Sequence, residues 1–86
     1  MQTGAGVVTV AFEDPAGRPL VDAIVSIASA PGEFPDIGMI TDARGEIVIG
    51  DPGDGVYDFV VFAEGTPHRV SVRITPTDIR ITTVVT

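Results

Sequence analysis

The sequence predicts an all-β fold, a β-sandwich of seven strands. Val, Ile and Thr are abundant, whereas the aromatic residues are four Phe, one Tyr and no Trp, and this composition favours strands. Turn residues separate the apolar stretches about every ten residues, a spacing typical of a β-sandwich. Apolar residues at helical spacing are interrupted by Pro or Gly throughout, so the sequence predicts no helix.

Each predicted strand is an apolar or alternating stretch bounded by turn residues. In chain order the strands are Val7–Glu13, Ala23–Ser29, Met39–Thr41, Glu46–Ile49, Val56–Glu64, His68–Thr75 and Ile79–Val85. Because successive side chains of a strand point to opposite faces, alternation assigns one face to the core. The residues expected on that face are Val8, Val10, Phe12, Ala23, Val25, Ile27, Ile47, Ile49, Tyr57, Phe59, Val61, Val70, Val72, Ile74, Ile79 and Ile81.

Three connections carry the residues of specific β-turns. Segments 14–17 (DPAG) and 42–45 (DARG) have Asp first and Gly fourth, as type I turns prefer. Segment 51–54 (DPGD) has Gly third, where a type II turn needs a positive φ. In each turn the first Asp can accept a hydrogen bond from the backbone two residues later, which gives these acids a structural reason to be there.

Two further connections have different roles. Arg18–Asp22 joins the first two predicted strands, and we expect it to carry the chain from one sheet to the other. Ala30–Gly38 is long for a hairpin and contains Phe34 and Ile37. We therefore expect it either to fold over an end of the sandwich or to display a contact surface.

Length and composition limit the function classes. We expect the 86 residues to form a single domain over positions 1–86. The net charge of -7, with no Lys, repels phosphate backbones, so nucleic acid is not an expected partner. Cysteine is absent, which excludes disulfides and thiol chemistry. The sequence shows no secretory signal and no apolar run of membrane-spanning length, and it leaves open whether this is a whole protein or an excised domain.

Four segments carry a resemblance to a known family. In order they are EDPAGRPLVDAIVSI, TDARGEIVI, PGDGVYDFVVFAEG and HRVSVRI, and together they span about Val7 to Ile81. They resemble carboxypeptidase regulatory-like domains of the transthyretin-like (prealbumin-like) group. The resemblance implies a seven-stranded Greek-key sandwich, transthyretin-like or immunoglobulin-like in architecture. It also implies an accessory module of a secreted or surface protein, so an extracellular or cell-surface location is expected, or a cytoplasmic one if Met1 is the native start.

Two activities found in related folds do not fit this sequence. Pilin-like adhesin domains form an isopeptide bond between Lys and Asn or Asp, and this chain has no Lys and no Asn. Hydroxyisourate hydrolases use several histidines and a C-terminal Tyr-Arg-Gly-Ser. Here the single His is His68, and the sequence given ends in TTVVT.

The polar residues are better explained by structural roles than by catalysis or metal binding. The acidic turns contain no D-x-D-x-D-G calcium loop, and nearly all acids lie in or beside predicted turns, where water hydrates them. A lone His68 at a strand start is typical of a surface residue, and no serine lies in a G-x-S-x-G elbow. We therefore assign no catalytic, metal-binding or cofactor-binding residue, and expect no cofactor.

Apolar residues on an expected outer face are the main anomaly. In Val56–Glu64 the outward positions include Val60 and Phe62, and neighbouring strands could add Ile24 and Val48. Gathered on one sheet, these residues would form an exposed patch of the kind that binds proteins, with Phe34 as a further contact. The alternatives are that the 30–38 loop covers them or that they are scattered.

The C-terminal stretch is a second anomaly. Residues 79–86 have high β-propensity, a single Arg and no Pro or Lys. At a sheet edge they would be a template for pairing with another chain. We expect instead a fully paired strand, with a bulge at Thr82-Thr83 that resets the alternation.

These observations favour a non-catalytic structural or protein-protein interaction module. It would bind a protein partner, or a second copy of itself, through a sheet face or an edge strand. An alternative is a ligand- or carbohydrate-binding module, in one version calcium-dependent. The scarcity of aromatic residues counts against that alternative, because sugars are usually held on aromatic platforms.

Overall fold

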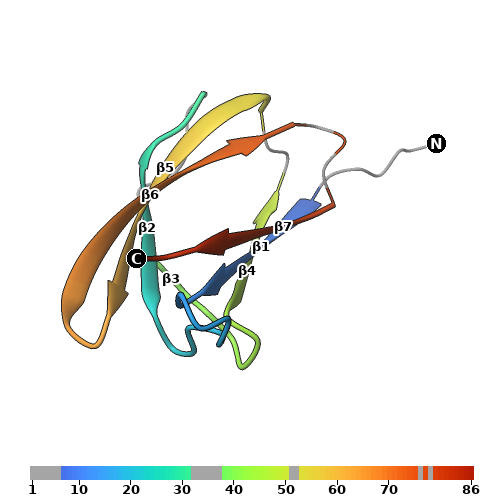
Figure 1. Cartoon of the computed structure of the whole chain (residues 1–86). Coiled ribbons are helices and arrows are strands. Elements are labelled where there is room, and N and C mark those ends of the chain that lie inside the picture. Colours follow the sequence, from blue (N-terminus) through green and yellow to red (C-terminus); the bar gives the residue numbers. More distant parts are fainter. Residues whose placement is uncertain (1–6, 32–37, 51–52, 76, 78) are drawn as a thin grey trace.

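The computed structural model describes residues 7–31, 38–50, 53–75, 77 and 79–86. These residues form strands and turns without a helix, which confirms the all-β prediction. The strands make two facing sheets, as a sandwich requires (Figure 1). One sheet has the order β4 (Glu46–Gly50), β1 (Val7–Glu13), β7 (Arg80–Val84), and the other has the order β3 (Met39–Ile40), β2 (Ile24–Ser29), β5 (Gly55–Ala63), β6 (Thr66–Ile74). The connection between β1 and β2 therefore carries the chain from one sheet to the other, as predicted.

The strand bounds follow the predicted ones closely. They are β1 Val7–Glu13, β2 Ile24–Ser29, β3 Met39–Ile40, β4 Glu46–Gly50, β5 Gly55–Ala63, β6 Thr66–Ile74 and β7 Arg80–Val84. The largest difference is at the β5–β6 hairpin, where the turn consists of Glu64 and Gly65 alone. Their φ angles of 53° and 77° match a two-residue turn whose twist fits paired strands, so β6 begins earlier than predicted.

The core lies between the two sheets and consists mainly of the predicted inward side chains. Its buried members are Val8, Val10, Phe12, Ala23, Val25, Ile47, Ile49, Tyr57, Phe59, Val61, Val72, Ile74 and Val85. Phe12 of β1 meets Phe59 of β5 edge to face, with ring centroids 5.6 Å apart, and so joins the sheets. Ile27, Val70 and Ile81 are partly buried against this core.

The C-terminal strand departs from the prediction in two ways. β7 pairs with β1 in parallel, from Thr9 with Arg80 to Glu13 with Val84, without a register shift, so Thr82-Thr83 is not a bulge. Alternation therefore continues unbroken through β7, and Val85 is buried just beyond its end. Ile79 precedes the strand and is 81% exposed, so its assignment to the core is wrong.

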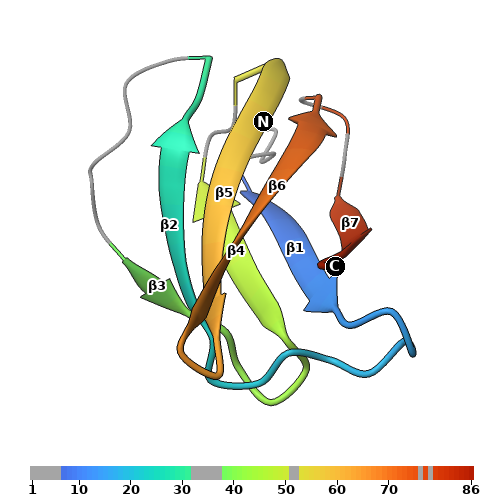
Figure 2. The same ribbon diagram turned by 60° about the vertical axis from the view of Figure 1, so that its left-hand side comes forward.

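β7 is also an edge strand. Among the described residues it pairs with β1 alone, so it forms the edge of the three-stranded sheet (Figure 2). The expectation of a fully paired C-terminal strand is therefore wrong. The sequence could not reveal this, because pairing depends on a first strand that lies about 70 residues earlier in the chain.

Candidate interaction surfaces

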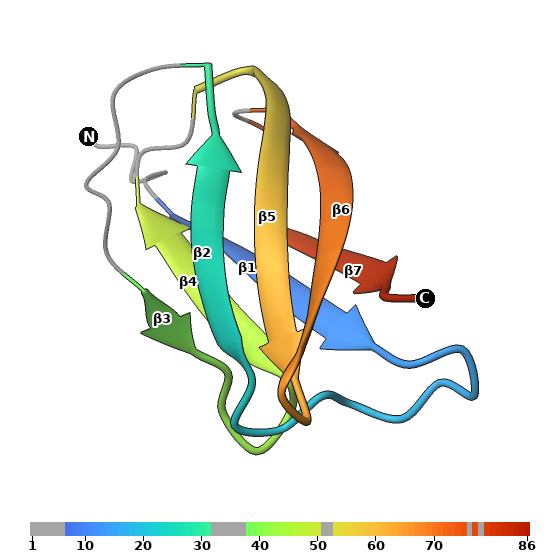
Figure 3. The same ribbon diagram turned by 90° about the vertical axis from the view of Figure 1, so that its left-hand side faces the viewer.

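One apolar row crosses the outer face of the four-stranded sheet. Ile24 of β2 lies opposite both Ile40 of β3 and Phe62 of β5, and Phe62 lies opposite Pro67 of β6. Ile40, Ile24 and Phe62 are 66%, 49% and 41% exposed, and Pro67 is exposed as well. We call these four residues the apolar row. At the usual strand separation it is about 14 Å wide and spans the whole sheet, whose outer face is toward the viewer in Figure 3.

The apolar row is bordered by one mixed row and then by a polar region. Two residues along β5, Val60 is half-buried, with Ser26 on one side and Arg69 on the other. Among the described residues, Arg69 belongs to none of the ion pairs. Beyond this row, Asp58 accepts a hydrogen bond of 2.5 Å from the Ser71 hydroxyl. The contiguous apolar surface thus lies at the end of the sheet near the β5–β6 turn, and the exposed Val56 at the other end is separated from it by Asp58.

The structure brings together three of the five residues predicted to bind protein. Ile24, Val60 and Phe62 lie on the outer face of the four-stranded sheet, as expected. Val48 is 58% exposed but lies on β4, opposite Thr9 in the other sheet, so the prediction that it joins them is wrong. The reason is that alternation tells which side of a strand faces out, but not which sheet the strand enters. Phe34 lies outside the described residues.

Sequence reasoning missed two members of the apolar row. Ile40 falls in a predicted strand, but its alternation could not be read over so short a stretch. Pro67 lies between two of the predicted strands, whereas it is the second residue of β6. A signal for Pro67 existed in the sequence, because Glu64-Gly65 can form a two-residue hairpin turn that sets Phe62 opposite Pro67.

The acidic turns have the predicted structural role. Asp14 Oδ1 accepts hydrogen bonds of 2.9 Å from the backbone N–H groups of Ala16 and Arg18, and Gly17 N–H donates to the Asp14 carbonyl at 2.9 Å. Arg18 Nε also donates to Asp14 Oδ2 at 3.0 Å. The bond from the Arg18 backbone is the main reason that the pKa of Asp14 lies below its ordinary value.

Asp42 repeats this arrangement in the second type I turn. Its Oδ1 accepts hydrogen bonds from the Arg44 N–H at 2.8 Å and the Glu46 N–H at 3.0 Å, and Gly45 N–H donates to its carbonyl at 3.0 Å. The backbone bond from Glu46, followed by that from Arg44, lowers the pKa of Asp42. Both aspartates therefore serve the local backbone. The type II turn predicted at 51–54 lies partly outside the described residues.

Thr41 connects β3 to the chain before β2. It is 1% exposed, and its Oγ1 accepts a hydrogen bond from Ala23 N–H at 2.8 Å and donates one to the Leu20 carbonyl at 2.6 Å. Backbone bonds between residues 41 and 22–23 add to this connection. The sequence predicted Thr41 only as the last residue of the strand Met39–Thr41 and gave no sign of this bonding role.

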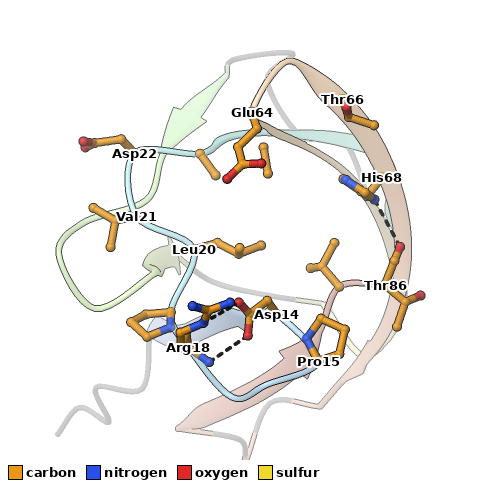
Figure 4. A pocket seen from close by; sticks show the side chains of 14 residues that line it. Asp14, Pro15, Arg18, Leu20, Val21, Asp22, Glu64, Thr66, His68 and Thr86 are labelled. Atoms are coloured by element: carbon orange, nitrogen blue, oxygen red, sulfur yellow. Dashed lines mark hydrogen bonds and ion pairs between the residues drawn. The ribbon is translucent and has the colours of Figure 1, made fainter.

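An open cavity of about 730 Å³ lies at one end of the sandwich (Figure 4). Asp14, Arg18, Leu20, Glu64 and His68 are among the residues that line it. The Asp14–Arg18 ion pair occupies part of the wall, and His68 Nδ1 lies 3.1 Å from the Thr86 carbonyl oxygen. Asp14, Arg18 and the Nδ1 atom of His68 are thus engaged with the protein itself.

Comparison with known proteins leaves the family open. A scan of the sequence against protein-family models and a search of curated proteins found no match. Within the described part of the chain, no three His, Asp or Glu side chains lie close enough to hold a metal ion. The same residues include no helix with the length and apolarity needed to cross a membrane. The resemblance to carboxypeptidase regulatory-like domains stays a prediction that rests on the sequence motifs.

Proposed function

We propose that this chain is a non-catalytic structural and protein–protein interaction module, and that the apolar row is its binding surface. The observation that carries the proposal is the row itself, because it aligns an apolar residue on every strand of one sheet at the solvent face. Isolated apolar residues on a surface are ordinary, but a contiguous set in one register is a feature of contact surfaces.

The size of the apolar row suggests how a partner would use it. From the exposed fractions, it presents on the order of 300 Å² of apolar surface, comparable to the largest patch on a typical monomer. A stable complex buries about 800 Å² on each partner, so the row would form the centre of a larger interface. Arg69 and Val60 would lie at its rim, and a partner that offers apolar side chains with a carboxylate beside them matches this arrangement.

Fold and location enter the proposal as well. A transthyretin-like Greek-key sandwich of the carboxypeptidase regulatory-like type is supported by β1 lying between β4 and β7, and by β2 lying between β3 and β5. In both sheets, strands distant in the chain are neighbours, as Greek-key connections require. We place the module in a secreted or surface protein, where the family it resembles mostly occurs.

The binding surface can be tested with two matched substitutions on β5. Phe62→Asp puts a charge in the apolar row, whereas Val56→Asp puts the same charge at a position that is 48% exposed on the same face, beyond Asp58. Immobilised parent and variants are incubated with extract of the source organism. Proteins retained by the parent and by Val56→Asp, but lost with Phe62→Asp, are the expected result.

The control for this experiment is the melting temperature of each variant, which we expect to stay within about 4 °C of the parent because both positions face solvent. If the parent, Phe62→Asp and Val56→Asp retain the same set of proteins, the apolar row is not the binding surface. If none retains any protein, the proposal of an interaction module through this row fails.

A further inference from the structure

The open side of β7 presents unpaired backbone groups. Thr9 N–H donates to the Ile79 carbonyl at 2.9 Å, and Val85 N–H donates to the Glu13 carbonyl at 2.8 Å. Because backbone groups alternate sides along a strand, the odd-numbered residues of β7 bond to β1 and the even-numbered ones point away. The even-numbered residues are Arg80, Thr82 and Val84. None of the described residues forms a hydrogen bond with their N–H or C=O groups.

This edge is better suited to pairing than the other three. β3 is only two residues long, and β6 carries Pro67, Arg69 and Arg73, residues that discourage added strands. β4 ends in Gly50, which has low strand propensity. β7 and its flanks consist of β-branched residues apart from Arg80, and they expose Val84 at 49% and Ile79 at 81%.

Charge does not oppose the approach of an identical edge. Although the chain has a net charge of -7, Arg80 is the single charged residue of β7. Arg80 forms an ion pair across β1 with Glu46 of β4, so the charge at the edge is balanced within the chain. The backbone groups of the edge can be satisfied by an extended polypeptide strand, and a neutral β-branched strand is the best match for its side chains.

We propose that this extended strand is β7 of a second copy, joined antiparallel across a two-fold axis at Thr82. In this register Thr82 lies opposite Thr82, and Arg80 lies opposite Val84 of the second copy. The three outward-pointing residues of one copy then pair with the same three residues of the second copy, and about six hydrogen bonds join the two strands. The result is one continuous sheet in the order β4-β1-β7-β7-β1-β4.

The side chains favour a two-fold axis at Thr82 over an axis at another residue of β7. A two-fold axis at Arg80 would place two guanidinium groups opposite each other, which is unfavourable. An axis at Thr82 separates the two Arg80 side chains by about four residues, or about 13 Å along the strands, and lays each aliphatic stem beside a Val84 side chain. It also places two threonines face to face, a favourable cross-strand pair. This contact uses a different surface from the apolar row and does not depend on it.

Cysteine cross-linking tests the position of the axis, because the natural chain has no cysteine. In the proposed pair the two Thr82 Cα atoms lie about 5.5 Å apart, within the range of a disulfide. Under mild oxidation, Thr82→Cys is expected to give a covalent dimer of twice 8.9 kDa. Val84→Cys is expected to stay uncross-linked, because the two positions lie about 13 Å apart. Val48→Cys, the corresponding position on the edge of β4, is the second control.

Charge variants test the same contact without a covalent bond. Thr82→Lys and Thr82→Glu each place like charges on the axis, so each alone is expected to be monomeric in sedimentation up to about 1 mM. Mixed in equal amounts, they place Lys opposite Glu and are expected to recover the dimer that the parent forms. A general loss of folding would not be reversed by mixing.

Four outcomes would overturn the proposal. They are a parent that stays monomeric to about 1 mM, a cross-link through Val48→Cys instead of Thr82→Cys, equal cross-linking of Val84→Cys, and charge variants that do not associate when mixed. A monomeric parent that takes up a different extended peptide along β7 would assign the edge to a foreign strand, and self-pairing would be wrong.

Discussion

The Thr41 hydroxyl offers the sharpest test of how this sandwich is held together. It bonds to Ala23 N–H at 2.8 Å and to the Leu20 carbonyl at 2.6 Å, and Thr41 itself is 1% exposed. Thr41→Val keeps the shape of the side chain but removes the hydroxyl. The Ala23 N–H, in a residue that is 3% exposed, then loses its acceptor, and the Leu20 carbonyl loses a donor.

The expected cost follows from these two bonds. Leaving a buried backbone group unpaired costs about 1–3 kcal/mol, and the partly buried Leu20 carbonyl adds about 1 kcal/mol, so Thr41→Val should lose about 3 kcal/mol. A domain of 86 residues has a free energy of unfolding of about 4–13 kcal/mol, so this is a large share. The midpoint of thermal unfolding should fall by about 12–24 °C.

Thr41→Ser is the matched control, because it keeps both hydrogen bonds and removes one methyl group, at a cost of about 1 kcal/mol. The two variants are compared by urea unfolding and by thermal melting, with far-ultraviolet circular dichroism as the probe. If Thr41→Val proves as stable as Thr41→Ser, the hydroxyl contributes nothing to stability beyond its volume, and the two hydrogen bonds do not hold the sandwich together.

Two further predictions concern the type I turns. Gly45 has a φ of +74°, and an added Cβ would lie 2.7 Å from the Phe12 carbonyl oxygen, whereas Gly17 has a φ of +87° with nothing within 4 Å. Gly45→Ala should therefore cost about 1–3 kcal/mol more than Gly17→Ala in urea unfolding, and equal costs would contradict the close approach. For Asp42, a folded-state pKa below the ordinary value means that its stabilising effect is complete above about pH 4 and is lost as the pH falls through the folded pKa. Asp42→Asn, which keeps the acceptor oxygen, should show a smaller drop in melting temperature between about pH 5 and pH 2 than the parent, and an unchanged drop would contradict this assignment.

The turns and the inward faces of most strands were predictable because their causes are local. An Asp that begins a type I turn finds its hydrogen-bond donors within four residues, as Asp14 and Asp42 do. Alternation along a strand is likewise a property of the backbone, and it placed Phe12, Tyr57 and Phe59 in the core correctly. Alternation failed at Ile79, which lies outside the strand that it was expected to join.

The sequence alone determined an all-β chain with these strands, these turns and a surplus of apolar residues on outward faces. The tertiary structure decided which outward residues meet: Phe62 joins Ile24 and Ile40 in one row, whereas Val48 belongs to the opposite sheet. It also decided that the last strand lies at an edge, beside the first. The physical reason is that alternation depends on neighbours in the chain, whereas strand order depends on how two sheets bury their apolar faces together, a property of the whole chain.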